Sequence, residues 1–174
     1  MALSFSHVRS TRLQTQEDPG LVARRSLAPP GLLRCLVVSW SECRISLLRA
    51  AAEAEAWEAI ACSNPRQFLR NVFQESVPLT LIDLPPASSK VYSEFRVAAV
   101  RAKDRGESLL VVSVAEGCAT DELWARELGV WSYLPELTGQ EGWELVFSDA
   151  RQAIARQATA YLESSAQARP CRGT

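Results

Sequence analysis

The acidic residue Asp83 ends an apolar run, and this placement raises a question of chemistry. The run, PLTLID at residues 78–83, is typical of a strand buried on both faces, and a Pro-Pro break follows closely. A carboxylate at the end of a buried strand usually has a charged or hydrogen-bonding partner or a functional role, because burying a charge is costly. Asp83 is therefore the first candidate for a functional side chain.

Composition excludes several other kinds of site. The single histidine, His7, lies in the first segment, so the core has none for catalysis. No G-x-G-x-x-G or G-x-x-x-x-G-K motif is present to cradle a nucleotide. The formal net charge is -1, which gives no electrostatic case for binding nucleic acid or an anionic membrane. We therefore expect no enzymatic activity and no cofactor.

The cysteines are odd in number and form no C-x-x-C pair, which argues against a disulfide framework and a zinc site. We expect reduced and mostly buried thiols in a cytoplasmic protein. No apolar run approaches the roughly 20 residues that span a bilayer. The cysteines are Cys35, Cys43, Cys62, Cys118 and Cys171.

Five short apolar segments alternate with five amphipathic ones, which predicts a β-α unit repeated five times. Such alternation implies a parallel sheet with helices on both faces. Ligands of these sheets bind at the carboxyl ends of the strands, where Ser39, Asp83 and Ser113 would lie. The predicted strands are residues 33–40, 57–62, 77–83, 108–114 and 130–134, and the predicted helices begin near residues 41, 64, 88, 120 and 142.

Three residues are predicted to begin helices. Asn64 precedes Pro65 and suits an N-cap, Ser88 or Ser89 caps the third helix, and Thr120 caps the fourth. The expected buried stripes include Phe73 on the second helix, Leu123 on the fourth, and residues 147–161 on the last.

The two ends of the chain lack the patterns of folded segments. We expect a flexible arm over residues 1–31, one domain over 32–163, and a disordered tail over 164–174. The chain stops after the last predicted helix with no DNA-binding helix-turn-helix, so we expect any output to work by contact.

Three stretches are informative together with the five-fold β-α order: LIDLPP at residues 81–86, LLVVSVAEG at residues 109–117 and LGVWSYLPEL at residues 128–137. With them, residues 33–156 resemble a bacterial response-regulator receiver domain of the chemotaxis type. LIDLPP stands for that family's third-strand aspartate motif, LLVVSVAEG for its fourth strand, and LGVWSYLPEL for its pattern G-A-x-D-Y-L-x-K-P, in which Gly129, Tyr133 and Leu134 match. The resemblance implies a three-layer α/β/α sandwich with a five-stranded parallel sheet in the flavodoxin-like order 2-1-3-4-5. It also implies a role in two-component signal transduction.

The resemblance places Asp83 at the phosphoacceptor position and Ser113 at the position of the hydroxyl that grips the phosphoryl group. Ser39 and Trp40 replace the acid pair that helps to hold Mg²⁺, and Glu136 replaces the lysine. One like charge about 4 Å away costs on the order of 4 kcal/mol at an effective dielectric constant of about 20. The receiver resemblance is therefore to a degenerate form, or pseudo-receiver.

Trp40 admits two interpretations: it fills the emptied pocket, or it points outward as a binding anchor. The face of helix four, strand five and helix five is the usual partner surface in receivers. This makes Trp124, Trp131 and Tyr133 candidates for an interface, with core packing as the alternative for each.

Three functions follow from these observations. The first is a phosphorylation-independent protein–protein interaction module, binding a kinase, an output protein or itself. The second is a response regulator that accepts a phosphoryl group on Asp83, with Glu42 as a substitute Mg²⁺ ligand. The third is a small-molecule sensor at the strand ends, with Trp40 stacking on the ligand.

Overall fold

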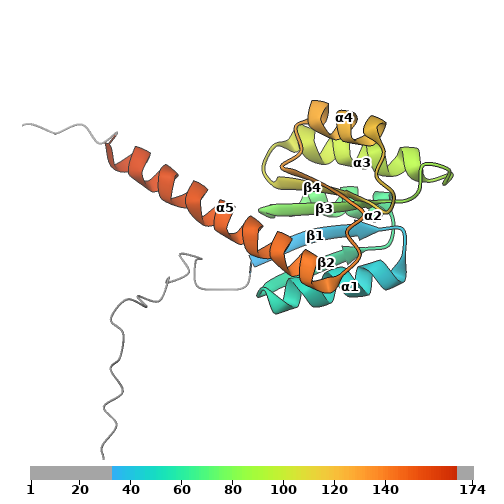
Figure 1. Cartoon of the computed structure of the whole chain (residues 1–174). Coiled ribbons are helices and arrows are strands. Elements are labelled where there is room, and N and C mark those ends of the chain that lie inside the picture. Colours follow the sequence, from blue (N-terminus) through green and yellow to red (C-terminus); the bar gives the residue numbers. More distant parts are fainter. Residues whose placement is uncertain (1–32, 168–174) are drawn as a thin grey trace, which may run out of the picture.

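The computed structural model describes residues 33–167, and these form a five-stranded parallel sheet in the order β2-β1-β3-β4-β5. Five helices alternate with the strands (Figure 1). This confirms the predicted fold class and strand order. The strands are β1 (Leu33–Ser39), β2 (Trp57–Cys62), β3 (Leu79–Leu84), β4 (Leu109–Val114) and β5 (Ser132–Pro135). The helices are α1 (Glu42–Ala54), α2 (Pro65–Gln74), α3 (Tyr92–Arg105), α4 (Ala119–Leu128) and α5 (Gln140–Gln167).

The sheet separates two apolar cores, which is why its strands are apolar almost without interruption. On β1, Leu36 and Val38 belong to the core beneath α2 and α3. Cys35 and Val37 belong to the core beneath α1 and α5. The alternation of side chains along each strand thus fills both layers at once.

The start of α2 agrees with the predicted cap. The Asn64 side chain accepts a hydrogen bond from the Gln67 amide at 2.9 Å, and Pro65 is the first helical residue. The third helix begins later than predicted, at Tyr92. Ser89 is instead part of the preceding turn, where its hydroxyl accepts a hydrogen bond from the Val91 amide at 3.4 Å.

The fourth helix is capped by a cysteine, so the prediction for Thr120 is wrong. Cys118 is the N-cap of α4, and its Sγ accepts a hydrogen bond from the Asp121 amide at 3.3 Å. The helix therefore begins one residue before Thr120. The expected inner face is also wrong, because Leu123 is exposed while Asp121 and Ala125 are buried. Phe73 of α2, another expected core residue, is exposed as well.

The last helix is longer than the sequence pattern indicated. Trp143, Phe147 and Ala150 are buried against the sheet. The helix then continues to Gln167, past the predicted domain boundary at residue 163, and Figure 1 shows it projecting beyond the sheet. Of its predicted apolar stripe, Tyr161 is exposed. No helix within residues 33–167 is both long and apolar enough to cross a membrane.

The cysteines divide into two classes. Cys35 and Cys62 are buried, whereas Cys43 and Cys118 are exposed. The expectation of mostly buried thiols thus fails for two of the four described, and Cys171 lies outside the described residues. Burial, with a smaller effect from Glu58, raises the pKa of Cys35 to about 12.

We expect this division to appear in thiol reactivity, since the thiolate is the reacting form. In the native protein at pH 8, iodoacetamide should alkylate Cys43 and Cys118 and leave Cys35 and Cys62 unmodified. Peptide mass spectrometry measures each site, and the same reaction in urea is the control. Modification of Cys35 at the native rate of Cys43 would contradict the assignment.

Candidate functional site

Three polar side chains lie in one row at the carboxyl edge of the sheet. Ser39 of β1 is in register with Asp83 of β3, and Asp83 is in register with Ser113 of β4. In parallel strands, residues in register project to the same face. This row therefore shares the face of Val37 and Val111, which is the face covered by α1 and α5.

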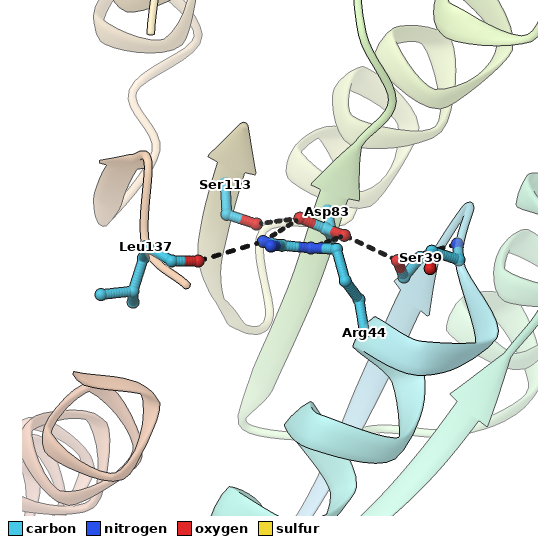
Figure 2. A network of polar contacts seen from close by, with 6 residues as sticks. Ser39, Arg44, Asp83, Ser113 and Leu137 are labelled. Atoms are coloured by element: carbon cyan, nitrogen blue, oxygen red, sulfur yellow. Dashed lines mark hydrogen bonds and ion pairs between the residues drawn. The ribbon is translucent and has the colours of Figure 1, made fainter. Parts of the chain in front are cut away.

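Asp83 is fully buried, and each of its carboxylate oxygens accepts two hydrogen bonds. Oδ2 accepts from the Ser39 hydroxyl at 2.6 Å and from Arg44 Nε at 2.6 Å. Oδ1 accepts from the Ser113 hydroxyl at 2.7 Å and from Arg44 Nη2 at 2.8 Å. Figure 2 shows this arrangement. A carboxylate has about four lone-pair sites, so these donors leave none of them free.

Arg44 reaches this position from the first turn of α1. Side chains of a helix lean toward its N-terminus, and here that direction leads to the carboxyl edge of the sheet. A cation near a helix N-terminus is disfavoured by the helix dipole. The bidentate pairing with Asp83 offsets this cost, because charge-assisted forked pairs are among the stronger hydrogen bonds.

The guanidinium of Arg44 also binds two further elements. Nη2 donates to the Leu137 carbonyl at 3.3 Å, in the loop between β5 and α5. The guanidinium carbon lies 5.9 Å from the ring centroid of Trp143, within the range of a cation–π contact. Arg44 thus joins α1, β3, the β5–α5 loop and the start of α5.

These contacts bear directly on phosphoryl chemistry. A carboxylate attacks through a free lone pair, and both oxygens of Asp83 are occupied by donors. Its side chain is inaccessible to solvent, so a phosphoryl donor has no approach without movement of Arg44. An acid at a strand end can be held by loop amides or be partly solvated, but the partners of Asp83 are a guanidinium and two hydroxyls.

The remaining residues predicted for this site do not contact Asp83 and are exposed to solvent. Trp40 is 45% exposed, so the prediction that it fills the pocket is wrong, because the group beside Asp83 is Arg44. Glu136 and Glu42 are exposed as well. Within residues 33–167, no group of three or more acidic, histidine or cysteine side chains could hold a metal ion.

Sequence reasoning did not identify Arg44, although one signal was present. Its position, in the first turn of a helix that follows a buried strand, is an unfavourable one for a cation. Such a residue indicates a specific acidic partner, and Asp83 was the buried acid already expected at that edge.

The candidate interface residues differ in exposure. Trp131 precedes β5 and is 37% exposed, while Trp124 and Tyr133 are partly buried and pack against the core beneath α3. The Arg96 guanidinium stacks over the Trp124 ring at 4.2 Å. Core packing thus accounts for Trp124 and Tyr133, and Trp131 offers the larger accessible surface.

A second polar cluster joins α3 to α4. Asp121 is buried at the start of α4 and accepts a hydrogen bond from the Tyr92 hydroxyl. Arg96 lies 3.9 Å from the same carboxylate and 5.7 Å from the Tyr92 ring centroid. Burial, followed by the hydrogen bond and the charge of Asp121, raises the pKa of Tyr92 to about 12.

A double-mutant cycle measures the Arg44–Asp83 pair. Arg44→Gln leaves a buried carboxylate without its cation and should cost about 3–5 kcal/mol in unfolding free energy. Asp83→Asn should cost about 1–3 kcal/mol. The double variant should lie at least about 1 kcal/mol closer to wild type than the sum of the two.

Urea denaturation of the four proteins gives these values. Arg126→Gln, which breaks the exposed pair of Arg126 with Glu122, is the matched control and should cost less than about 0.5 kcal/mol. Additive effects of the two site substitutions would show that the pair does not contribute as described.

The burial of Tyr92, together with its hydrogen bond to Asp121, should make stability fall in alkali. The native pKa of Tyr92, about 12, is above its ordinary value of 10.0, so the folded state holds the phenolic proton more tightly. The resulting stabilisation is complete below pH 10 and is lost as the pH rises from 10 toward 12. Tyr92→Phe should flatten this part of the curve, measured by urea denaturation at each pH. Equal slopes in both proteins would refute the assignment.

Comparison with known proteins finds likeness in structure alone. No family model matches the sequence, and no curated protein matches it. A CheY-like response regulator receiver domain protein from Methanospirillum hungatei superposes with a TM-score of 0.64 at 13% identity, over 73% of this chain and 99% of that chain. The signal receiver domain of a putative Luxo repressor from Vibrio parahaemolyticus gives a TM-score of 0.62 at 13% identity, over 75% and 97% of the two chains.

A third solved structure was determined with a phosphorylated aspartic acid and a calcium ion. This response regulator from Burkholderia pseudomallei has a TM-score of 0.57 at 16% identity and covers 79% of this chain and 75% of its own. Identities this low establish the fold and nothing finer. Residues 33–167 therefore have the fold of a response-regulator receiver domain.

Proposed function

We propose that this chain is a receiver-like signalling domain that acts through protein–protein contact without phosphorylation of Asp83. The observation that carries the proposal is the bidentate pair of Arg44 with Asp83, in which the guanidinium binds both oxygens of a fully buried carboxylate. The chain itself supplies the countercharge that a metal ion and a lysine supply in the receivers it resembles.

Phosphorylation would have to undo this arrangement first. The Asp83 oxygen that attacks must lose its bonds to Arg44 and to one serine, and separating a buried pair costs about 3–5 kcal/mol. The exposed Glu136, at the lysine position, adds a negative charge to the same edge. No acidic cluster within residues 33–167 would hold Mg²⁺ to offset these costs.

One contact favours the phospho-accepting alternative. A guanidinium binds phosphoryl oxygens bidentately, so Arg44 could hold the group in place of a lysine once Asp83 released it. The same residue therefore stabilises the carboxylate before the reaction and a phosphoryl group after it. The balance between these two states is what an experiment must measure.

The contact surface that we propose is the outer side of α4 and the start of β5. Trp131 and Leu123 are both exposed there, at 37% and 59%. Aromatic residues are enriched in interface hot spots, and the polar rim is provided by the exposed Arg126 and Glu127. A signalling protein or a second copy of this chain would bind this face.

Incubation with acetyl phosphate and Mg²⁺ tests the central claim. We expect no gain in mass equal to a phosphoryl group, because Asp83 is both paired and buried. Beryllofluoride with Mg²⁺ should likewise leave the tryptophan fluorescence unchanged, although Trp143 lies against Arg44 and would report its displacement.

A receiver domain that retains the acid pair and the lysine is the positive control for both reagents. A mass gain that maps to Asp83, and that Asp83→Asn abolishes, would establish the phospho-accepting function instead. A mass gain in the Arg44→Gln variant but not in the wild-type protein would show that the guanidinium blocks the reaction.

A further inference from the structure

We propose that the outer side of α2, formed by Arg66, Arg70 and Phe73, binds an acidic segment of a partner protein. We call these three exposed side chains the α2 face. They belong neither to the site of Asp83 nor to the contact surface on α4 and β5. The α2 face is therefore a second surface for a partner, whatever the state of Asp83.

The spacing of the three residues places them on one side of the helix. Arg70 follows Arg66 by four residues, and Phe73 follows Arg70 by three. Residues three or four apart are neighbours on a helix surface, so the α2 face runs for about 10 Å along two turns. Phe68 and Val72 point to the opposite side, where they are buried in the core beneath α2 and α3.

The two arginines of the α2 face have no acidic partner among residues 33–167. Neither guanidinium forms an ion pair, a hydrogen bond or a cation–π contact there. The helix itself, PRQFLRNVFQ, contains no acid. Like charges four residues apart destabilise a helix, so Arg66 and Arg70 do not serve the stability of α2.

The acids that follow α2 and α3 along the chain are paired with other arginines. Glu75 comes directly after α2, and its Oε2 lies 2.7 Å from Arg34 Nη1. Glu107 comes shortly after α3, and its Oε2 lies 3.1 Å from Arg105 Nε. These two acids therefore do not neutralise the α2 face.

A third arginine extends the positive charge onto α3. Arg105 Nη1 donates to the Val72 carbonyl, so this side of α3 is turned toward α2. Arg101 lies one turn before Arg105 on the same side of the helix and is exposed. Its guanidinium likewise has no acidic partner within residues 33–167. The two helices together present three unpaired arginines.

Phe73 adds an apolar anchor to this positive surface. Its side chain is 61% exposed, whereas Phe68, Phe95 and Phe147 are buried. Aromatic and arginine side chains are enriched in the centres of protein interfaces, where lysine is depleted. An exposed aromatic ring one turn from an unpaired arginine has the composition of such a centre.

The number of charges favours an acidic protein segment over a lipid or nucleic acid surface. Juxtamembrane recognition of anionic lipids uses clusters of about four to eight basic residues, and three are present here. The whole chain has a formal net charge of -1, which gives no long-range attraction to a polyanion. Arginines bind carboxylates bidentately, so two of them one turn apart match two glutamates with the same spacing on a partner helix.

Fluorescence anisotropy with the full chain tests the proposal. The probe is a fluorescein-labelled helical peptide with two glutamates four residues apart and a leucine three residues after the second. We expect saturable binding that weakens as the salt concentration rises. The double variant Arg66→Gln/Arg70→Gln and the variant Phe73→Ala should each bind at least about tenfold more weakly.

The controls separate the α2 face from the rest of the surface. A peptide with glutamines in place of both glutamates should not bind. Arg49→Gln changes an exposed arginine of α1 that also lacks an acidic partner within residues 33–167, and Leu145→Ala changes a residue of α5 that is 67% exposed. Both helices cover the other face of the sheet, so neither variant should alter the affinity.

Urea denaturation of the double variant distinguishes a binding role from a structural one. Its unfolding midpoint should equal or exceed that of the wild-type protein, because the substitutions break no ion pair and remove a repulsion between like charges. A lowered midpoint would assign the two arginines to the stability of the fold and overturn the proposal.

Three further outcomes would overturn it. The first is equal binding of the glutamate and glutamine peptides, or no binding of either. The second is binding to vesicles that contain phosphatidylserine, lost in the double variant, without binding of the acidic peptide, which would identify a lipid surface instead. The third is a dimer in sedimentation analysis that the double variant abolishes, which would identify a second copy as the occupant. The phosphorylation test of Asp83 is independent of all three.

Discussion

The buried ion pair of Arg44 and Asp83 is the constraint on which the carboxyl edge of the sheet depends. A carboxylate without solvent must have a countercharge and donors for its lone pairs, and this structure provides one guanidinium and two hydroxyls. Because the guanidinium also binds the Leu137 carbonyl, the pair sets the relation between α1 and the loop that leads to α5. Loss of either partner would leave a buried charge uncompensated.

A strand-end carboxylate can be neutralised by an exchangeable ion or by a side chain. The receiver domains that this chain resembles use a metal ion and a lysine, and such a site can change its charge when a phosphoryl group arrives. An arginine of the same chain is present at all times and does not exchange with solution as a metal ion does. Neutralisation by Arg44 therefore favours a single state of the edge, in keeping with the function proposed above.

The fold could be predicted from the sequence because its signals are redundant. Mostly apolar runs such as residues 109–112 occur in each central strand, and a helical segment between successive strands supplies the crossover that a parallel arrangement needs. The row of Ser39, Asp83 and Ser113 followed from the same reasoning, since parallel strands bring their carboxyl ends together.

The site's partner could not be predicted in the same way. Whether Trp40 or Arg44 turns toward Asp83 depends on the path of the β1–α1 turn, which the apolar pattern of the sequence does not specify. The exposure of Trp40 and the inward direction of the partly buried Arg44 side chain go with the start of α1 at Glu42. Similarly, Cys118 rather than Thr120 caps α4, because a thiol can accept a helix amide as a hydroxyl does.

The two edges of the sheet therefore differ in how accessible their groups are to a ligand or a partner. At the carboxyl edge, the charge that could respond to a phosphoryl group or a metal ion is already paired and buried. At the opposite edge, α5 continues beyond the sheet and β1 begins beside it. If the carboxyl edge has one state, a conformational change that a binding partner recognises must occur elsewhere. The remaining places are the outer faces of the helices and the parts of the chain that extend beyond the receiver fold. The projecting part of α5 is the element at which such a change would be least opposed by the core, because its residues beyond Ala155 are exposed to solvent through residue 163.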